Sequence, residues 1–148
     1  EQIKSKTCHR IYLALVEGVV KDDSGVIDTF IGRSDKNHTM MAVKDSGRRA
    51  VTHFKVLKRY KENTFMEFAL ETGRTHQIRV HTKYIGHPIV GDPVYGYKNQ
   101  KYNLNGQLLH AYKLELTHPM MGERMTFEAP LPEYFKEILD KLDKSLKK

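Results

Sequence analysis

The sequence predicts one α+β domain, with a mostly antiparallel mixed sheet and flanking helices. Residues 11–20 form a near-continuous apolar run, which is typical of a strand buried on both faces. Residues 50–60 and 64–72 alternate between apolar and polar side chains around a three-residue connection, as in a β-hairpin. Residues 131–147 carry apolar side chains at helical spacing. A length of 148 residues suits a single domain.

The first half of the chain is predicted to be β-structure throughout. A turn sequence, DDSG at residues 22–25, follows the apolar run and predicts a returning strand over residues 26–31. A short strand is predicted over residues 39–43. In the hairpin, one face of each strand is apolar, and we expect those faces to point into the core. The side chains on these two apolar faces are Thr52, Phe54, Val56, Met66, Phe68 and Leu70.

The periodicity changes after residue 74 and predicts a helix over residues 75–85. Its inward face, at spacings of three to four residues, consists of Ile78, His81, Thr82 and Ile85. Its outward face consists of His76, Arg79 and Lys83. Gly86 is suited to end the helix as a C-terminal cap, and the following His-Pro pair prevents its continuation.

The last third of the chain is predicted to contain a long loop, two strands and a helix. The loop covers residues 91–106, which are rich in Gly, Asn, Tyr and Pro, and the strands cover residues 108–117 and 124–128. The helix over residues 131–147 has Pro132 at its first position. Its apolar stripe, expected to pack on the sheet, consists of Tyr134, Phe135, Ile138, Leu139, Leu142 and Leu146.

Composition narrows the class of protein. The formal net charge is +7, a balance often found in nucleic-acid-binding domains and also in many other basic proteins. No apolar stretch approaches the roughly 18 residues of a membrane span, and a single Cys excludes an internal disulfide and a Cys-rich zinc site. His76 and His81 are five residues apart, which puts them on different sides of a helix, so we expect no metal site. The simplest interpretation is a cytoplasmic globular protein.

The segment TGRTHQIRVH, residues 72–81, concentrates two arginines and two histidines where a strand meets a helix. Backbone amides of residues 73–75 at the start of a helix favour an anion, and Arg74 has the geometry to hold a carboxylate or a phosphate. A structural ion pair at the strand end explains the same residues equally well. Tyr12, taken alone, fits a core aromatic within an apolar strand.

Five motifs occur in an order that resembles the RluA-type pseudouridine synthases, and the RluD-like branch in particular. They are YLALVEG (12–18), GRTHQIRVH (73–81), GHPIVGDPVYG (86–96), LLHAYKLELTHP (108–119) and MTFEAPLP (125–132). The resemblance implies a pseudouridine synthase fold. It also implies an enzyme that isomerises uridine to pseudouridine in RNA without a cofactor or a metal. Large-subunit ribosomal RNA is the favoured target and transfer RNA the alternative. The target nucleotide would be flipped out of the RNA stack into the active site.

The resemblance also assigns residues. Tyr12 matches the family's active-site tyrosine, which packs on the flipped base, and Arg74 matches the arginine that pairs with the catalytic aspartate. Such a pair keeps the carboxylate ionised and oriented. Leu109 resembles an apolar contact lining the base pocket. By charge and position, His76, Arg79 and Lys83 are expected to contact the RNA backbone.

One departure from the family pattern concerns the catalytic aspartate itself. The family carries it in an HRLDxxTSG-type motif upstream of the tyrosine strand, and residues 1–148 contain no such motif. The first ten residues, EQIKSKTCHR, resemble the end of the helix that lies, in the family, between the aspartate motif and the tyrosine strand. We therefore expect residues 1–148 to form one domain that is the C-terminal portion of a catalytic domain. The aspartate segment and any upstream S4-like domain are expected to be absent from it.

This expectation has consequences for activity and assembly. The chain alone would be inactive, and it would self-associate through a sheet edge exposed by truncation. Two alternative functions stay open at this stage. One is a non-catalytic RNA-binding module, and the other is a basic domain that binds a small phosphorylated ligand near Arg74.

Overall fold

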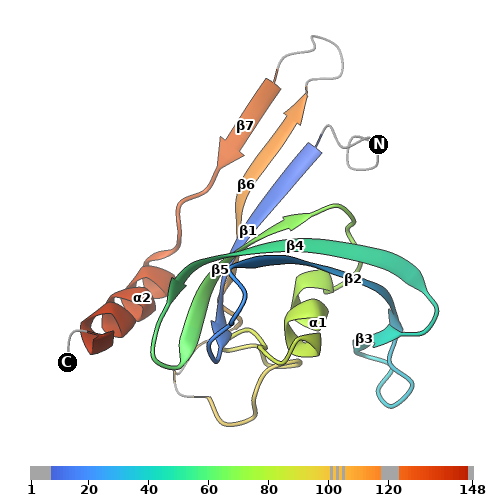
Figure 1. Cartoon of the computed structure of the whole chain (residues 1–148), viewed down its shortest axis with the longest axis horizontal. Coiled ribbons are helices and arrows are strands. Elements are labelled where there is room, and N and C mark those ends of the chain that lie inside the picture. Colours follow the sequence, from blue (N-terminus) through green and yellow to red (C-terminus); the bar gives the residue numbers. More distant parts are fainter. Residues whose placement is uncertain (1–7, 101, 103, 105, 118–123, 147–148) are drawn as a thin grey trace.

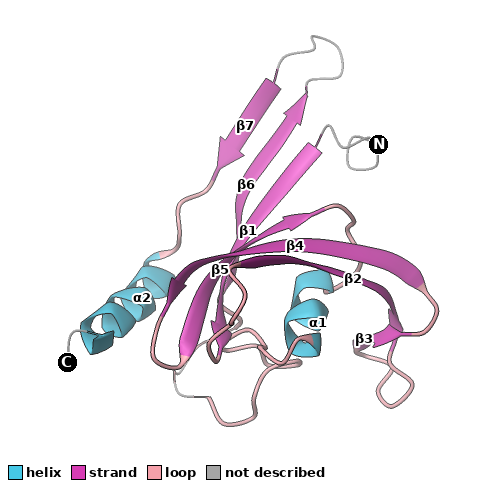
Figure 2. Ribbon diagram, in the orientation of Figure 1, coloured by secondary structure: helices cyan, strands magenta, loops and turns pink. Residues whose placement is uncertain are grey.

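The computed structural model describes residues 8–100, 102, 104, 106–117 and 124–146. The strands are β1 (Cys8–Glu17), β2 (Ser24–Arg33), β3 (Met41–Lys44), β4 (Arg48–Arg59), β5 (Asn63–Leu70), β6 (Leu109–Thr117) and β7 (Arg124–Glu128), and the helices are α1 (Gln77–Tyr84) and α2 (Glu133–Leu146). The strands form one sheet in the order β3-β2-β4-β5-β1-β6-β7 (Figures 1 and 2). The α+β class is confirmed, but every described strand pairing is antiparallel rather than mixed.

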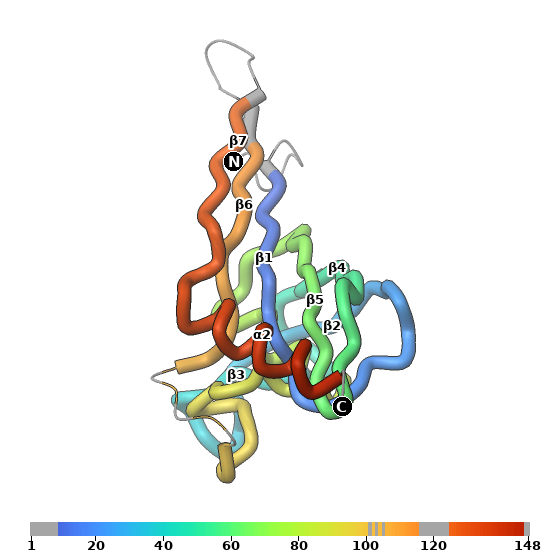
Figure 3. Tube along the Cα trace, turned by 90° about the vertical axis from the view of Figure 1, so that its left-hand side faces the viewer, coloured from blue at the N-terminus to red at the C-terminus, as the bar shows by residue number. Residues whose placement is uncertain are grey.

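Strand β1 lies inside the sheet and is buried on both faces, as its apolar run predicts. Ala14 packs in a cluster with Phe68 and with Ile78 of α1. Leu15, the next residue, packs in a second cluster with Phe135 of α2. Because successive strand residues point to opposite faces, the two helices pack on opposite faces of the sheet. Figure 3 shows the sheet from the side that α2 covers. The strand ends at Glu17 rather than at residue 20, since Gly18 turns the chain with φ +77°.

The predicted hairpin is confirmed as β4 and β5. Arg59 pairs with Thr64 beside the connection, and a register shift follows Val56. The apolar faces that the alternation predicts meet in the core, where Phe68 is fully buried. The strands predicted over residues 26–31, 39–43 and 108–117 are present with shifted ends, and the one predicted over residues 124–128 matches β7. The described residues between 91 and 106 lie outside helices and strands, as expected for a loop.

Helix α1 is shorter than the predicted helix, and Gly86 (φ +87°) ends it as expected. Of its predicted inward face, three residues are buried, while Ile85 is half-buried beyond the helix end. Gln77 and Val80 are buried as well, so the helix is enclosed on a wider arc than the sequence indicates. Figure 1 shows α1 inside the curve that β2 and β4 form.

Helix α2 begins at Glu133, so the prediction for Pro132 is wrong by one position. The Pro132 carbonyl accepts hydrogen bonds from the amides of Phe135 and Lys136, which places this proline just before the first helical residue. The stripe of Phe135, Ile138 and Leu142 is buried against the sheet as predicted. Two predicted members, Tyr134 and Leu146, are 51% and 39% exposed, because they lie at the margin and the end of the contact. None of the described helices is long and apolar enough to cross a membrane.

Candidate active site

A pocket of about 270 Å³ opens where β1, the β5–α1 turn and the start of β6 meet. Five of the six residues singled out from the sequence line it, namely Tyr12, Arg74, His76, Arg79 and Leu109. These residues come from positions up to 97 apart in the chain, so the fold alone brings them together. Lys83 is the exception, because it is exposed in the last turn of α1 and does not line the pocket.

Tyr12 reaches the pocket from the middle of β1, beside an irregularity in the sheet. Ile11 pairs with Lys113 whereas Tyr12 pairs with Ala111, so Tyr112 is an extra residue on β6. A bulge of this kind bends the strand and re-aims nearby side chains, and bulges are frequent next to active sites. Tyr12 is half-buried, so its ring packs against the core while it remains accessible from the pocket.

Arg74 lies in the turn between β5 and α1, and two hydrogen bonds fix it there. Its amide donates to the Gln77 side-chain oxygen at 3.0 Å, and its guanidinium Nε donates to the Arg49 carbonyl at 2.7 Å. The expectation that this turn offers its amides to an anion is therefore wrong for the Arg74 N–H, which Gln77 already occupies. The remaining guanidinium nitrogens are the groups that Arg74 can present to an anion.

Gln77 is a positioning residue that the sequence reading missed. Its oxygen also accepts from the Thr72 hydroxyl, and its amide nitrogen donates to the Val51 carbonyl and the Thr52 hydroxyl. Gln77 is buried, and these bonds tie the turn to β4. A Gln three residues after Arg74 whose side chain reaches back to its amide resembles half of a capping box, and this spacing is the signal that would have identified it.

The hydrogen bonds of Gln77 connect through the Thr52 hydroxyl to His81, which is fully buried. One ring nitrogen lies 2.8 Å from the Thr52 hydroxyl and the other 2.9 Å from the Thr29 hydroxyl. Burial lowers the pKa of His81 to about 4, although the nearby Asp28 opposes the shift. The imidazole is therefore neutral at physiological pH, and both of its nitrogens are satisfied by hydroxyl groups.

His76 combines an unusual backbone with a defined side-chain contact. Its φ of +56° is rare for a residue other than Gly, and such strain is concentrated at functional sites. Its Nδ1 lies 2.8 Å from the Tyr95 hydroxyl, which also accepts a hydrogen bond from the Met41 amide at 2.9 Å. Burial and then the charge of Arg79 lower the pKa of His76. A contact from His76 to RNA would thus rely on a hydrogen bond rather than on a positive charge.

Arg79 is held in a buried ion pair rather than projecting into solvent. Its Nε and one terminal nitrogen each bond an Asp92 carboxylate oxygen at 2.9 Å, and the side chain is 13% exposed. Asp92 also accepts the amides of Val94 and Tyr95 at 3.0 Å. Burial alone would raise the pKa of Asp92, but these hydrogen bonds outweigh it and lower that pKa. The pair joins α1 to the loop that follows it.

Arg10 brings a second guanidinium into the pocket. From the sequence, this residue was expected at the end of a helix. It lies on β1, two residues before Tyr12, and one terminal nitrogen donates to the Thr72 carbonyl at 3.2 Å. Its Nε is buried without a hydrogen-bond partner among the described residues. A side chain at Gly73 would come within 2.5 Å of this guanidinium, so the glycine makes room for it.

The pocket is positively charged and lacks acidic side chains among its described lining residues. Arg10 and Arg74 both face it, and the Asp92 carboxylate next to Arg79 is already paired. Such a site favours an anionic group, either a carboxylate or a phosphate. Among residues that the structure describes, no three of His, Cys, Asp and Glu lie close enough to hold a metal ion together.

Residues 1–84, more than half of the chain, match the family of RNA pseudouridylate synthases. The chain belongs to this family. The RNA pseudouridine synthase YlyB of Bacillus subtilis is 50% identical over 144 residues, covering 97% of this chain and 47% of YlyB. The ribosomal large subunit pseudouridine synthase D of Neisseria meningitidis, serogroup A, is 47% identical over 95% of this chain and 40% of its own length. The chain thus spans about half the length of the curated relatives it matches.

Two solved pseudouridylate synthase domains share the fold. Human RNA pseudouridylate synthase domain containing 1 superposes with a TM-score of 0.76 at 24% identity, covering 96% of this chain and 68% of that structure. Human RNA pseudouridylate synthase domain containing 4 gives a TM-score of 0.75 over 96% and 65%. At this identity the likeness establishes the fold, and it confirms that the seven-stranded antiparallel sheet is part of a pseudouridine synthase architecture.

Proposed function

We propose that the chain is the C-terminal part of a catalytic domain that converts uridine to pseudouridine in large-subunit ribosomal RNA, in the cytoplasm. The observation that carries the proposal is the convergence of Tyr12, Arg74 and Leu109 on one pocket. The family resemblance names these three residues from separate motifs. A chance assignment would have no reason to place an aromatic ring, a guanidinium and an aliphatic side chain around one cavity.

Each residue has a role that its position supports. Tyr12 and Leu109 offer apolar contacts for the flat faces of an extruded base. Arg74 is fixed by Gln77 and by the Arg49 carbonyl, so its guanidinium can orient a carboxylate without a further loss of side-chain freedom. An arginine beside a carboxylate favours its ionised form. Arg10 supplies a second positive group to the same pocket.

The reaction itself requires one group that the described pocket does not contain. Isomerisation breaks the bond from ribose C1′ to uracil N1, forms a bond from C1′ to C5, releases the C5 hydrogen to solvent as a proton, and leaves a proton on N1. The family performs this with an aspartate, and no described residue lining the pocket is acidic. We propose that the aspartate comes from a part of the full-length protein outside residues 1–148, and that the chain alone is inactive.

A test uses the full-length protein and ribosomal RNA tritiated at uracil C5, because forming pseudouridine releases that tritium. Changing Arg74→Met is expected to lower the rate about 100-fold or more, since the carboxylate loses its orienting partner. The matched control is Arg33→Met, an exposed arginine on β2 outside the pocket. Equal rates for wild type and Arg74→Met would refute the role of Arg74, and absence of tritium release from wild-type protein would leave RNA binding without catalysis.

We also propose that the isolated chain self-associates through the sheet edge at β7. This strand is paired on one side only within the described sheet, and Phe127 on it is 52% exposed. Edge strands of this kind template pairing with another chain. Sedimentation of the 148-residue chain should show concentration-dependent dimers, and a monomer at high concentration would contradict this.

A further inference from the structure

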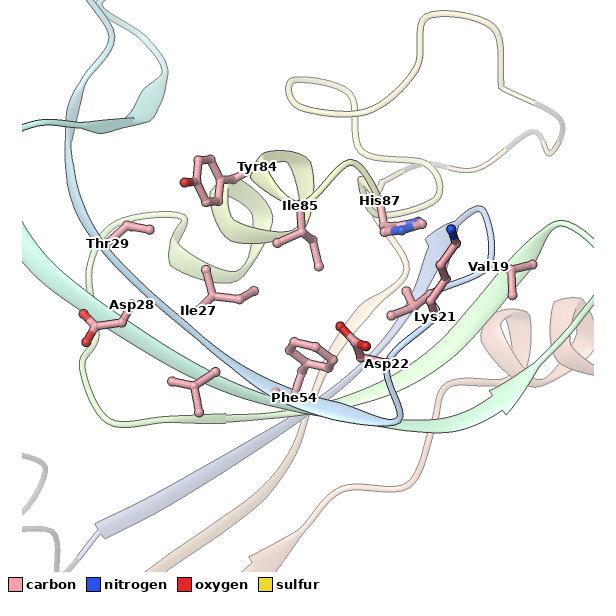
Figure 4. Close-up of a pocket in the computed structure, with 13 residues that line it drawn as sticks. Val19, Lys21, Asp22, Ile27, Asp28, Thr29, Phe54, Tyr84, Ile85 and His87 are labelled. Carbon is pink, nitrogen blue, oxygen red and sulfur yellow. The ribbon is translucent and has the colours of Figure 1, made fainter.

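A second and larger pocket of about 590 Å³ lies at the opposite end of α1 from the active-site pocket (Figure 4). The residues at the start of α1 face the active site, whereas Tyr84, Ile85 and His87 at its end line this second pocket. An eight-residue helix is about 12 Å long. A strand of RNA whose nucleotide is held in the active site could therefore reach the second pocket within a few nucleotides.

The floor of this pocket is a flat aromatic surface that a glycine uncovers. Phe54 on β4 lies opposite Gly25 on β2. A Cβ atom at Gly25 would come within 2.7 Å of two carbons of the Phe54 ring, so any side chain there would displace the ring. Ile27 extends the apolar floor, whereas Ile85 and the exposed ring of Tyr84 line the pocket from the α1 side.

The walls are held in place by hydrogen bonds, so the cavity does not depend on a ligand for its shape. Arg59 donates to the carbonyls of Val20 and Lys21 at 2.8 and 3.1 Å and pairs with Asp23, which fixes the β1–β2 turn. His87 Nδ1 donates to the Glu17 carbonyl at 2.8 Å. Because Nδ1 carries this hydrogen, the Nε2 of a neutral His87 is a hydrogen-bond acceptor.

Two polar side chains on the rim are available to a ligand. Figure 4 shows the Asp22 carboxylate beside the Phe54 ring and the Lys21 ammonium near His87. Within the described part of the chain, neither group forms a hydrogen bond or an ion pair with another side chain. By contrast, the neighbouring carboxylates of Asp23 and Asp28 are paired with arginines. The rim therefore offers one acceptor group and one donor group, carried by adjacent residues of the β1–β2 turn.

We propose that this pocket binds an unpaired purine of the RNA substrate, and guanine in preference to other bases. A flat aromatic floor with a polar rim is the usual receptor for an unstacked base. The Watson–Crick edge of guanine presents the O6 acceptor next to the N1–H and N2–H₂ donors. Lys21 complements O6, and the Asp22 carboxylate complements the two donors. The inference rests on the proposed function, because it assumes that the ligand is RNA.

The test is a titration of the ¹⁵N-labelled chain with each of the four nucleoside 5′-monophosphates, followed by NMR. GMP is expected to shift the amides of Lys21, Asp22, Gly25 and Ile85 in a saturable way, with at least about tenfold tighter binding than UMP, as expected for a lost bidentate contact. Asp22→Asn should abolish the preference for GMP. Tyr84→Ala should weaken GMP binding about fivefold or more, by the loss of stacking.

Matched controls separate binding from general effects. Asp45→Asn changes an exposed aspartate in the β3–β4 turn, and Tyr134→Ala removes a tyrosine of similar exposure on α2; neither should alter the titration. Overturning results are equal binding of all four nucleotides or no response of the Lys21–Gly25 segment to GMP. Shifts from UMP at Tyr12 and Leu109 report on the active-site pocket independently. A response there without one at Asp22 would reject the purine site and leave the proposed function intact.

Discussion

The Arg79–Asp92 ion pair should be the most sensitive point of the fold to a single substitution. Asp92 is 1% exposed and accepts four hydrogen bonds, two from Arg79 and two from backbone amides. In Asp92→Ala the Arg79 charge is left buried and unpaired, which typically costs about 3–5 kcal/mol of the free energy of unfolding. The two orphaned amides add to the loss. A domain stable by about 5–15 kcal/mol would lose a large fraction of its stability.

Urea denaturation followed by circular dichroism measures this loss. With a slope of about 2 kcal/mol per M, a loss of 4 kcal/mol lowers the midpoint by about 2 M. Asp35→Ala is the control, because the Lys44–Asp35 pair is at the surface and should contribute about 1 kcal/mol or less. Asp92→Asn, which keeps an acceptor for the amides, should fall between the two. An Asp92→Ala variant less than about 1 kcal/mol below wild type would refute the reasoning.

Three further effects are expected. The pKa of His81 is about 4 in the folded chain and near 6.5 in the unfolded chain, so the unfolded chain binds a proton first as the pH falls. The free energy of unfolding should therefore drop by about 3 kcal/mol between pH 6.5 and 4. Denaturation measured across this pH range should show a smaller drop in His81→Gln. Phe135→Ala should cost about 3–5 kcal/mol and Tyr134→Ala under about 0.5 in the same urea assay; similar values would contradict the burial of α2. Gly86→Ala should cost about 1 kcal/mol in urea, from its positive φ alone, since no atom lies within 4 Å of the added carbon; no loss would contradict this conformation.

Strand and helix positions followed from periodicity, whereas element ends depended on contacts that periodicity does not encode. The run ending at residue 20 was apolar throughout, yet β1 ends at Glu17 because Gly18 turns the chain beside His87. Tyr134 matched the apolar stripe of α2 and is nevertheless half exposed, because the sheet meets a narrower arc of the helix. The order of strands also required the structure, since β1 pairs with β5 and β6 rather than with its neighbour in sequence.

The sequence motifs identified individual residues of the candidate site, and the structure showed which of them lie together. Tyr12, Arg74 and Leu109 could be named from motifs, but their convergence on one pocket depends on the sheet order. Arg79 was predicted to be an exposed contact because its partner, Asp92, is 13 residues away in sequence. Arg10 was missed because the residues before Tyr12 were read as helical, whereas Cys8–Glu17 is a strand. Residues 1–7 of that predicted helix end lie outside the described residues.

We propose that this chain supplies Tyr12, Arg74 and Leu109 to a pseudouridine-forming site and that the catalytic carboxylate lies elsewhere in the full-length protein. Tritium release from C5-labelled ribosomal RNA, measured in parallel for the 148-residue chain and the full-length protein, tests it most directly. Release of tritium by the full-length protein and none by the 148-residue chain is the expected result. Release by the chain would show that its own residues complete the catalytic site, and no release by either would contradict the proposed activity.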